Sequence, residues 1–150
     1  MSLEDGAETI VDQCMKIDEG EKVLVLNDGN DQDLIDAILD VLREEQVDFR
    51  LEEYPEPENH GEEPPEEVAE MMKEMDAVIA PTLKSISHTE ARRDACESNV
   101  RVATLPGITK EIWNQSLQAD YSRVKELSDR LTNSWKMLEK LGLKLLAALI

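Results

Sequence analysis

A segment rich in hydroxyl groups holds the side chains of this sequence that are best suited to chemistry. Its candidate residues are Thr82, Lys84, Ser85, Ser87 and His88. They place three hydroxyl groups, a cation and an imidazole close to the start of a predicted helix. Backbone N–H groups and the helix dipole favour anions there. The segment therefore predicts a cleft-edge site for a carboxylate. The alternative is that the hydroxyl groups cap the helix and the lysine is solvated.

Residues that could bind a metal or a nucleotide form no recognised motif. His60 and His88 are the only histidines, and neither lies in an H-E-x-x-H pattern of helical ligands. His60 with Glu62 and Glu63 could hold a loosely bound cation, but an acidic loop is the simpler interpretation. The glycine-rich loops that cradle phosphates are also missing from the sequence. We therefore predict no catalytic residue, no metal ligand and no cofactor in this chain.

Apolar runs and helical stripes alternate along the first two thirds of the chain and must position these residues. The expected strands are 22–26, 47–54, 76–80 and 101–105, and the expected helices are about 4–16, 31–46, 64–75, 87–97 and 108–116. Such alternation implies right-handed crossovers and a parallel sheet. We expect an α/β fold, a doubly wound four-stranded parallel sheet in the order 2-1-3-4, with flanking helices and a long C-terminal helical segment.

The ends of these elements predict where ligands and caps lie. Ligands of such sheets bind beyond the carboxyl ends of the strands. The segments expected to meet there are 27–30, 54–61, 81–88 and 105–108. Asn30 or Asp31 is the expected N-cap of the second helix. Ser87 with Glu90 predicts a capping box for the fourth.

Charge and composition exclude several classes of protein. The 150 residues include 16 Lys and Arg against 34 Asp and Glu, a net charge of −18. Such acidity argues against nucleic acids and anionic membrane surfaces as partners. No apolar run reaches the roughly 18 residues of a membrane span, and no signal peptide opens the chain. Cys14 lies on an apolar stripe and Cys96 in the middle of a predicted helix, which predicts buried thiols. Because the two lie far apart in a sequence without a signal peptide, we expect reduced thiols and a cytoplasmic location.

The C-terminal segment differs from the rest of the chain. We expect an α/β domain at 4–118 and an amphipathic helical segment at 119–150. Residues 134–150 carry a charge of +2 and the preceding residues −20, which indicates a spliced or redesigned tail from about residue 134. Its interface candidates, spaced three or four residues apart, are Trp135, Leu138, Leu141, Leu145 and Leu149. Such a stripe covers the sheet of its own chain, joins two copies, or binds another protein.

Two runs of sequence resemble a known family. They are 60–69 (HGEEPPEEVA) and 80–93 (APTLKSISHTEARR), and 104–109 (TLPGIT) fits the same pattern. Over residues 7–133 the chain resembles the amino-terminal half of the metal-dependent aminopeptidases typified by aminopeptidase T. The two long runs are specific, whereas the alternation of strands and helices alone would not be.

The resemblance implies a domain without its catalytic partner. In that family the amino-terminal domain is α/β, a carboxy-terminal domain holds the divalent metal pair through Glu, His and Asp, and members are typically dimers that enclose the active site. The sequence stops where the second domain would begin, so the resemblance implies an amino-terminal domain that is inert by itself. The competing hypothesis is an engineered scaffold whose helix at 135–150 mediates dimerisation or protein binding.

Overall fold

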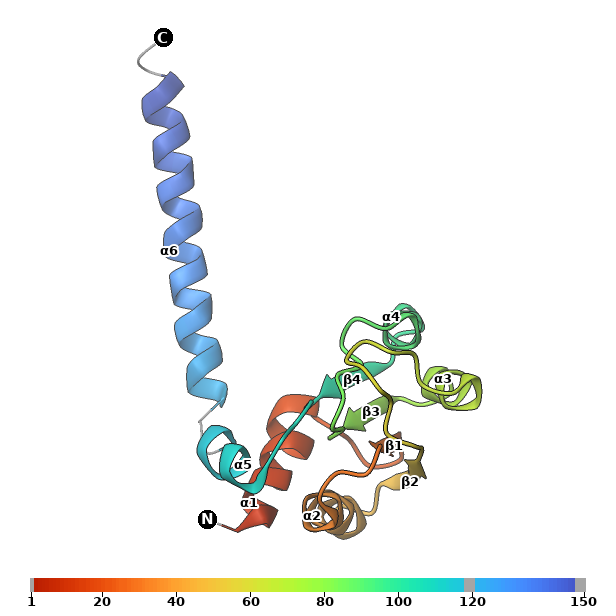
Figure 1. Ribbon diagram of the computed structural model, residues 1–150. Helices are drawn as coiled ribbons and strands as arrows, with labels where there is room; N and C mark the ends of the chain where they lie inside the picture. Colours follow the sequence, from red (N-terminus) through yellow and green to blue (C-terminus); the bar gives the residue numbers. More distant parts are fainter. Residues whose placement is uncertain (1, 118–120, 148–150) are drawn as a thin grey trace. The chain divides into compact units, whose positions relative to one another are not determined.

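The computed structural model describes residues 2–117 and 121–147, and within the second range it describes the side chains of 122–139 (Figure 1). The chain divides into two compact units, Met1–Gln118 and Ala119–Ile150. The first unit holds the sheet, and the second is a single helix in its described part. No helix among the described residues is long and apolar enough to cross a bilayer.

Four parallel strands form the sheet of the first unit. They are β1 (Lys22–Asn27), β2 (Asp48–Glu53), β3 (Ala77–Ala80) and β4 (Arg101–Thr104). Their order is β2-β1-β3-β4, which confirms the predicted topology. The two central strands are almost wholly buried because helices cover both of their faces, which is why their sequences are continuous apolar runs. The edge strands β2 and β4 are only partly buried.

Helices cover both faces of the sheet, as a doubly wound fold requires. One face packs against α1 (Leu3–Glu8), η1 (Thr9–Met15), α2 (Gln32–Glu44) and α5 (Lys110–Ser116). The other packs against α3 (Glu66–Lys73) and α4 (Glu90–Glu97). Side chains alternate between the faces, so Val23 and Val25 join the first core and Leu24 and Leu26 join the second.

The first helix differs from the prediction. An α-helix over 4–16 would turn Cys14 inward, but the chain changes from α-helix to π-helix at Thr9. Because a π-helix has a wider turn, Met15 joins the core and Cys14 is exposed. Cys96 is also exposed, because it follows the buried Ala95 on α4 and points away from the core. The prediction of buried thiols is therefore wrong.

Of the two predicted caps, one is confirmed and one is wrong. Asp31 caps α2, and its carboxylate accepts from the backbone N–H of Asp33 at 3.0 Å. The N-cap of α4 is Thr89, not Ser87, and its hydroxyl accepts from the N–H of Arg92. The reason is that residues 86–89 form a turn, in which the Thr89 N–H donates to the carbonyl of Ile86, so the helix begins later.

The second unit is helix α6, Tyr121–Ala147. It lies within the helical segment that the sequence predicts at 119–150. Its 27 residues contain no proline, and its one glycine, Gly142, does not interrupt it.

Candidate functional site

The loops at the carboxyl ends of the strands meet, as the sequence predicted. The side-chain amide of Asn30, after β1, donates to the carbonyl oxygens of Pro81 (2.9 Å) and Ile108 (3.3 Å). The N–H of Tyr54, after β2, donates to the carbonyl of Asn27 at 3.0 Å. Residues far apart in the sequence thus form one edge of the first unit (Figure 1).

A buried carboxylate fixes this edge, and the sequence analysis missed it. Asp28 is only 1% exposed. Its two oxygens accept from the backbone N–H groups of Leu83 (2.5 Å) and Lys84 (2.9 Å). A carboxylate that accepts from two N–H groups forms strong, charge-assisted hydrogen bonds. An acidic residue directly after a buried strand was the signal that could have identified it.

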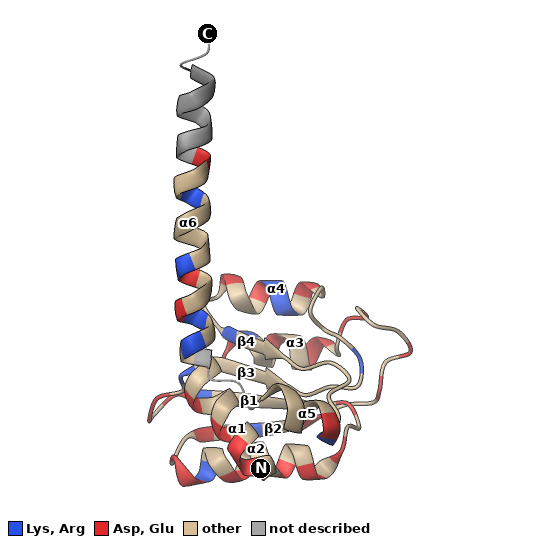
Figure 2. Ribbon diagram, turned by 90° about the vertical axis from the view of Figure 1, so that its left-hand side faces the viewer, with Lys and Arg blue, Asp and Glu red and all other residues tan. Residues whose placement is uncertain are grey.

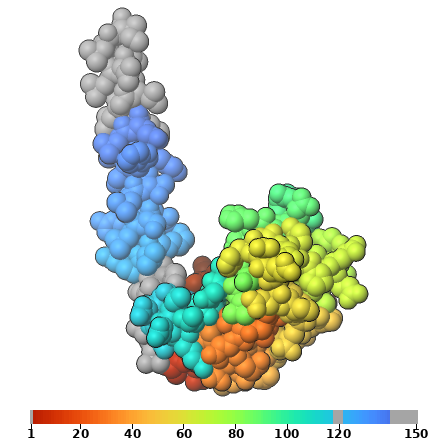
Figure 3. All heavy atoms as spheres, viewed as in Figure 1, coloured from red at the N-terminus to blue at the C-terminus, as the bar shows by residue number. Residues whose placement is uncertain are grey.

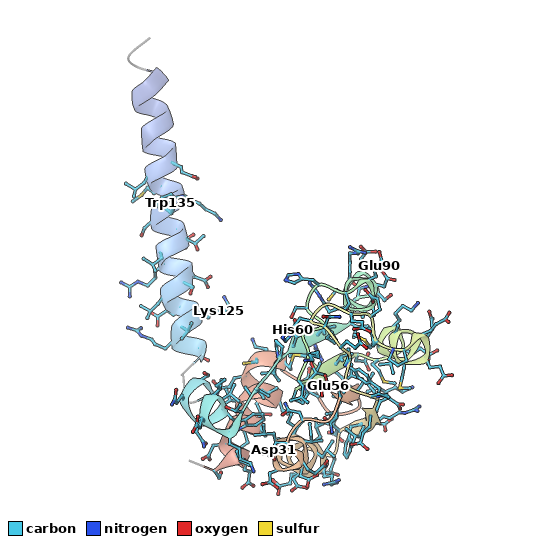
Figure 4. All side chains as sticks on the ribbon, viewed as in Figure 1. Asp31, Glu56, His60, Glu90, Lys125 and Trp135 are labelled. Atoms are coloured by element: carbon cyan, nitrogen blue, oxygen red, sulfur yellow. The ribbon has the colours of Figure 1, made fainter. Side chains whose placement is uncertain are left out.

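The predicted site residues are bonded mainly to their own chain. Thr82 is fully buried, and its hydroxyl donates to the carbonyl of Lys84 at 2.6 Å. The Lys84 ammonium lies 3.2 Å from a carboxylate oxygen of Glu56. The N–H of Ser85 donates to Nδ1 of His60 at 3.0 Å. Glu56 and His60 both belong to the loop after β2 (Figure 4), so these contacts join that loop to the hydroxyl-rich segment.

The N-terminus of α4, where we expected an outside anion, is occupied by a carboxylate of the same chain. The two oxygens of Glu63 accept from the N–H groups of Glu90 (2.6 Å) and Ala91 (3.1 Å). An anion thus binds at the start of α4 as expected, but the anion is Glu63, and it attaches the loop after β2 to this helix. Glu63 accepts these two hydrogen bonds, and His60 accepts one through Nδ1. Two of the three side chains proposed to bind a cation loosely at 60–63 are therefore used in hydrogen bonds within the chain.

The remaining two candidates differ in exposure. The hydroxyl of Ser87 lies 2.8 Å from the hydroxyl of Thr104 at the end of β4. His88 is exposed.

In the space-filling view the loop after β2 (yellow) lies against the segment that leads to α4 (green), which agrees with the contacts of His60 with Ser85 and of Glu56 with Lys84 (Figure 3).

A shallow pocket of about 390 Å³ lies between the ends of β1 and β2. It is lined by Asn27, Asp28, Gly29, Glu53, Tyr54, Pro55 and Glu56. Its lining contains three carboxylates and none of the predicted site residues, and Glu56 already pairs with Lys84 while Asp28 accepts from two N–H groups. Among the described residues, no group of three or more His, Cys, Asp or Glu side chains could hold a metal ion.

Tyr54, which lines this pocket, has its hydroxyl in an unusual environment. It is buried and has no hydrogen-bond partner within the described part of the chain. Burial, with a smaller contribution from the negative charge of Asp28, raises the pKa of Tyr54. The hydroxyl therefore stays neutral and is a poor candidate for an acid–base group.

The second unit presents a different kind of surface. Its large apolar side chains are exposed, with fractions of 47% for Val124, 43% for Leu127, 72% for Leu131, 66% for Trp135, 63% for Met137 and 61% for Leu138. Trp135 and Leu138 were interface candidates (Figure 4). The side chains of Leu141, Leu145 and Leu149 lie outside the described residues. An exposed apolar stripe of this size is typical of an interaction surface.

Comparisons with known proteins show the fold only. No family model matches the sequence, and no curated protein matches it. The structure is similar to that of 2,5-dihydroxypyridine dioxygenase from Pseudomonas putida KT2440, with a TM-score of 0.55 and 15% sequence identity. The likeness covers 71% of this chain and 36% of that chain. The present chain thus spans about a third of the length of that dioxygenase.

Proposed function

We propose that residues 4–118 are the amino-terminal scaffolding domain of an aminopeptidase-like metalloenzyme and carry no reacting group themselves. One observation supports this most directly. The two runs that resemble the family, 60–69 and 80–93, are bonded to each other through His60 with Ser85 and through Glu63 with the start of α4. These polar groups bind one another across the two runs, which supports a structural role for them at this edge.

In this proposal the loops at the carboxyl ends of the strands form a fixed surface, called here the wall, beside a separate catalytic domain. In the family that the sequence resembles, the divalent metal pair belongs to that domain. The contribution of this chain is positional. Asp28 holds the hydroxyl-rich segment through two backbone N–H groups, so the wall keeps one shape.

The test is to join this chain to the metal-binding domain of an aminopeptidase T-like enzyme. We expect the chain alone to give no turnover of a chromogenic leucine substrate with Zn²⁺, Co²⁺ or Mn²⁺, and the fusion to exceed the metal-binding domain alone. In the fusion, Asp28→Ala should lower turnover, whereas the exposed Glu58→Ala should not. Metal-dependent turnover by the unfused chain, or a fusion no faster than its metal domain, would overturn the proposal.

A second candidate function is association through α6. The observation that favours it is the stripe of Val124, Leu127, Leu131, Trp135 and Leu138, each of which is at least 43% exposed. Burying one large apolar side chain is worth roughly 1.5–3 kcal/mol, so the stripe favours association.

Sedimentation tests this second candidate. The intact chain should be larger than a monomer, and a chain that ends at Asn133 should be a monomer. Leu131→Glu with Leu138→Glu should also give a monomer without loss of the secondary structure of the first unit. The matched control, Ser122→Glu with Thr132→Glu, adds the same charge away from the stripe. An intact chain that is monomeric at high micromolar concentration would exclude self-association.

A further inference from the structure

The exposed face of α6 follows a seven-residue repeat. Val124, Leu131 and Leu138 are seven residues apart, and Leu127 occupies the second position of the repeat. At the next occurrence of that second position the polar Ser134 interrupts the apolar pattern. The sequence continues the pattern with Leu141 and Leu145. Apolar residues at these two positions of a heptad are the signature of helices that pair in a coiled coil.

The polar atoms on or beside this face are already satisfied within the helix. The hydroxyl of Ser134 donates to the carbonyl of Arg130 at 2.9 Å. The indole N–H of Trp135 donates to the carboxylate of Glu139 at 3.2 Å. Burial of the face against another apolar surface therefore leaves neither group without a partner.

The charged side chains of α6 also pair among themselves. Lys125 lies 2.6 Å from Asp129, and Arg123 lies 2.5 Å from Glu126. These pairs lie along one helix, three and four residues apart, and need no outside partner. The apolar side chains between Val124 and Leu138, by contrast, are exposed.

A second copy of α6 fits that face. The helix has 27 residues, which corresponds to about 40 Å. Both faces of the sheet are already covered by helices of the first unit. A helix with the same length and the same repeat matches the whole stripe, and each additional copy of the chain supplies one.

The charge of the chain decides the orientation of the pair. Residues 1–120 contain 10 Lys and Arg and 31 Asp and Glu, a net charge of −21. Residues 121–150 contain 6 Lys and Arg and 3 Asp and Glu, a net charge of +3. A parallel pair would bring two strongly acidic units to the same end. An antiparallel pair separates them by about the helix length, far beyond the screening length of about 8 Å at physiological salt.

We infer that α6 pairs with α6 of a second copy as an antiparallel two-stranded coiled coil. This inference rests on the association proposed above and adds the partner and the direction. The basic second half of the helix, with Lys136, Lys140 and Lys144, then runs toward the acidic unit of the partner copy. In the register with the most Leu–Leu pairs, Leu127 faces Leu145 of the partner copy and Leu131 faces its Leu141.

Disulfide trapping in the full-length chain tests the direction. The background carries Cys14→Ser and Cys96→Ser, because both native cysteines are exposed. Leu127→Cys and Leu145→Cys are made separately, mixed and oxidised. An antiparallel pair should give the mixed 127–145 disulfide and little of either homodisulfide, because the Cα atoms of a disulfide lie within about 7 Å.

The outcomes separate this inference from the association on which it rests. A 127–127 homodisulfide in a stable dimer would overturn the antiparallel direction and leave association standing. A monomer in sedimentation would overturn both. Salt gives an independent measurement, since the dissociation constant should rise or stay constant between about 10 and 150 mM salt. A dissociation constant that falls severalfold would show repulsion between neighbouring acidic units and a parallel pair.

Discussion

At the scale of single residues, buried polar groups of the first unit differ in how well they are satisfied. Asp28 accepts two backbone hydrogen bonds, although it is almost completely buried. Tyr54 is 7% exposed, and its hydroxyl has no partner among the described residues. The first group stabilises the loops, whereas the second costs free energy because it loses its hydrogen bonds to water on folding.

Tyr54→Phe should therefore stabilise the protein. Removal of an unsatisfied hydroxyl recovers part of a desolvation cost of about 1–3 kcal/mol, so we expect the free energy of unfolding to rise by about 1 kcal/mol. Urea denaturation at neutral pH measures it. A decrease of about 1 kcal/mol would instead show that the hydroxyl makes a hydrogen bond, for example to a bound water.

An ion pair between the start of β1 and β4 should make stability depend on pH. The hydrogen bond from Arg101, and then that from the N–H of Asp18, lower the pKa of Glu21 below its usual 4.5. A carboxylate with a lowered pKa stabilises the folded state above the unfolded-state pKa, and this contribution is lost as the pH falls through the folded-state pKa.

Glu21→Gln should therefore destabilise the protein at neutral pH but not in acid. The pair is partly exposed, so we expect a loss of less than about 1 kcal/mol at pH 7. The difference from the unsubstituted chain should persist at pH values above the unfolded-state pKa of Glu21 and disappear as the pH falls through its lower folded-state pKa. Denaturation at several pH values, with the exposed Glu19→Gln as control, measures it. A difference that is the same at every pH would contradict this assignment.

At the scale of elements, the packing of α1 against α5 depends on one glycine. Gly6 lies against the indole of Trp113, and a Cβ added at Gly6 would lie 2.0 Å from its Nε1. The same indole N–H donates to the carbonyl of Leu3 at 3.0 Å. The close approach of the two helices therefore requires a residue without a side chain.

Gly6→Ala should destabilise the first unit, although alanine favours helices. The gain in helix propensity is about 1 kcal/mol, but overpacking against a fixed indole typically costs about 1–3 kcal/mol or more. We expect a lower melting temperature, and no such change for Glu8→Ala on the exposed side. The double variant Gly6→Ala with Trp113→Phe should lose less stability than the sum of the losses in the two single variants. Additive losses would show that the two residues do not clash.

At the scale of the whole molecule, charge is distributed very unevenly. Acidic side chains are spread over the helices of the first unit, whereas basic and acidic side chains both occur along the coloured part of α6 (Figure 2). Over residues 121–150 the sequence has a net charge of +3. Several of the acidic residues line a groove of about 400 Å³ between α3 and α4, among them Glu66, Glu70 and Asp94. Like charges at this density repel one another and oppose the compact state.

Moderate salt should therefore raise the melting temperature of the protein. The screening length falls from about 30 Å at 0.01 M to about 10 Å at 0.1 M, which weakens the repulsion. Glu66→Gln with Asp94→Asn should reduce the rise, because fewer charges are left to screen. Calorimetry over this range measures both. A melting temperature that falls steadily with salt would contradict a dominant role for repulsion.

The sequence by itself determined the arrangement of the sheet. The run Val23–Leu24–Val25–Leu26 favours a buried parallel strand, and alternation in residues 47–54 predicts a second strand nearer an edge. Alternating strands and helices then limit the topology, because crossovers between parallel strands are right-handed. Resemblance to the aminopeptidases and association through α6 remain predictions from the sequence.

Only the tertiary structure decided how the candidate site is used. Asp28 bonds to N–H groups 55 and 56 residues away, and Glu63 closes the start of α4 from 27 and 28 residues away. The π-helical turn that exposes Cys14 leaves no mark on the apolar spacing. The spacing of apolar residues indicates which face of a helix or strand is buried, because the buried face needs an apolar residue at each repeat along the element. The partner of a single polar group depends on where distant loops meet, and local sequence does not encode that position.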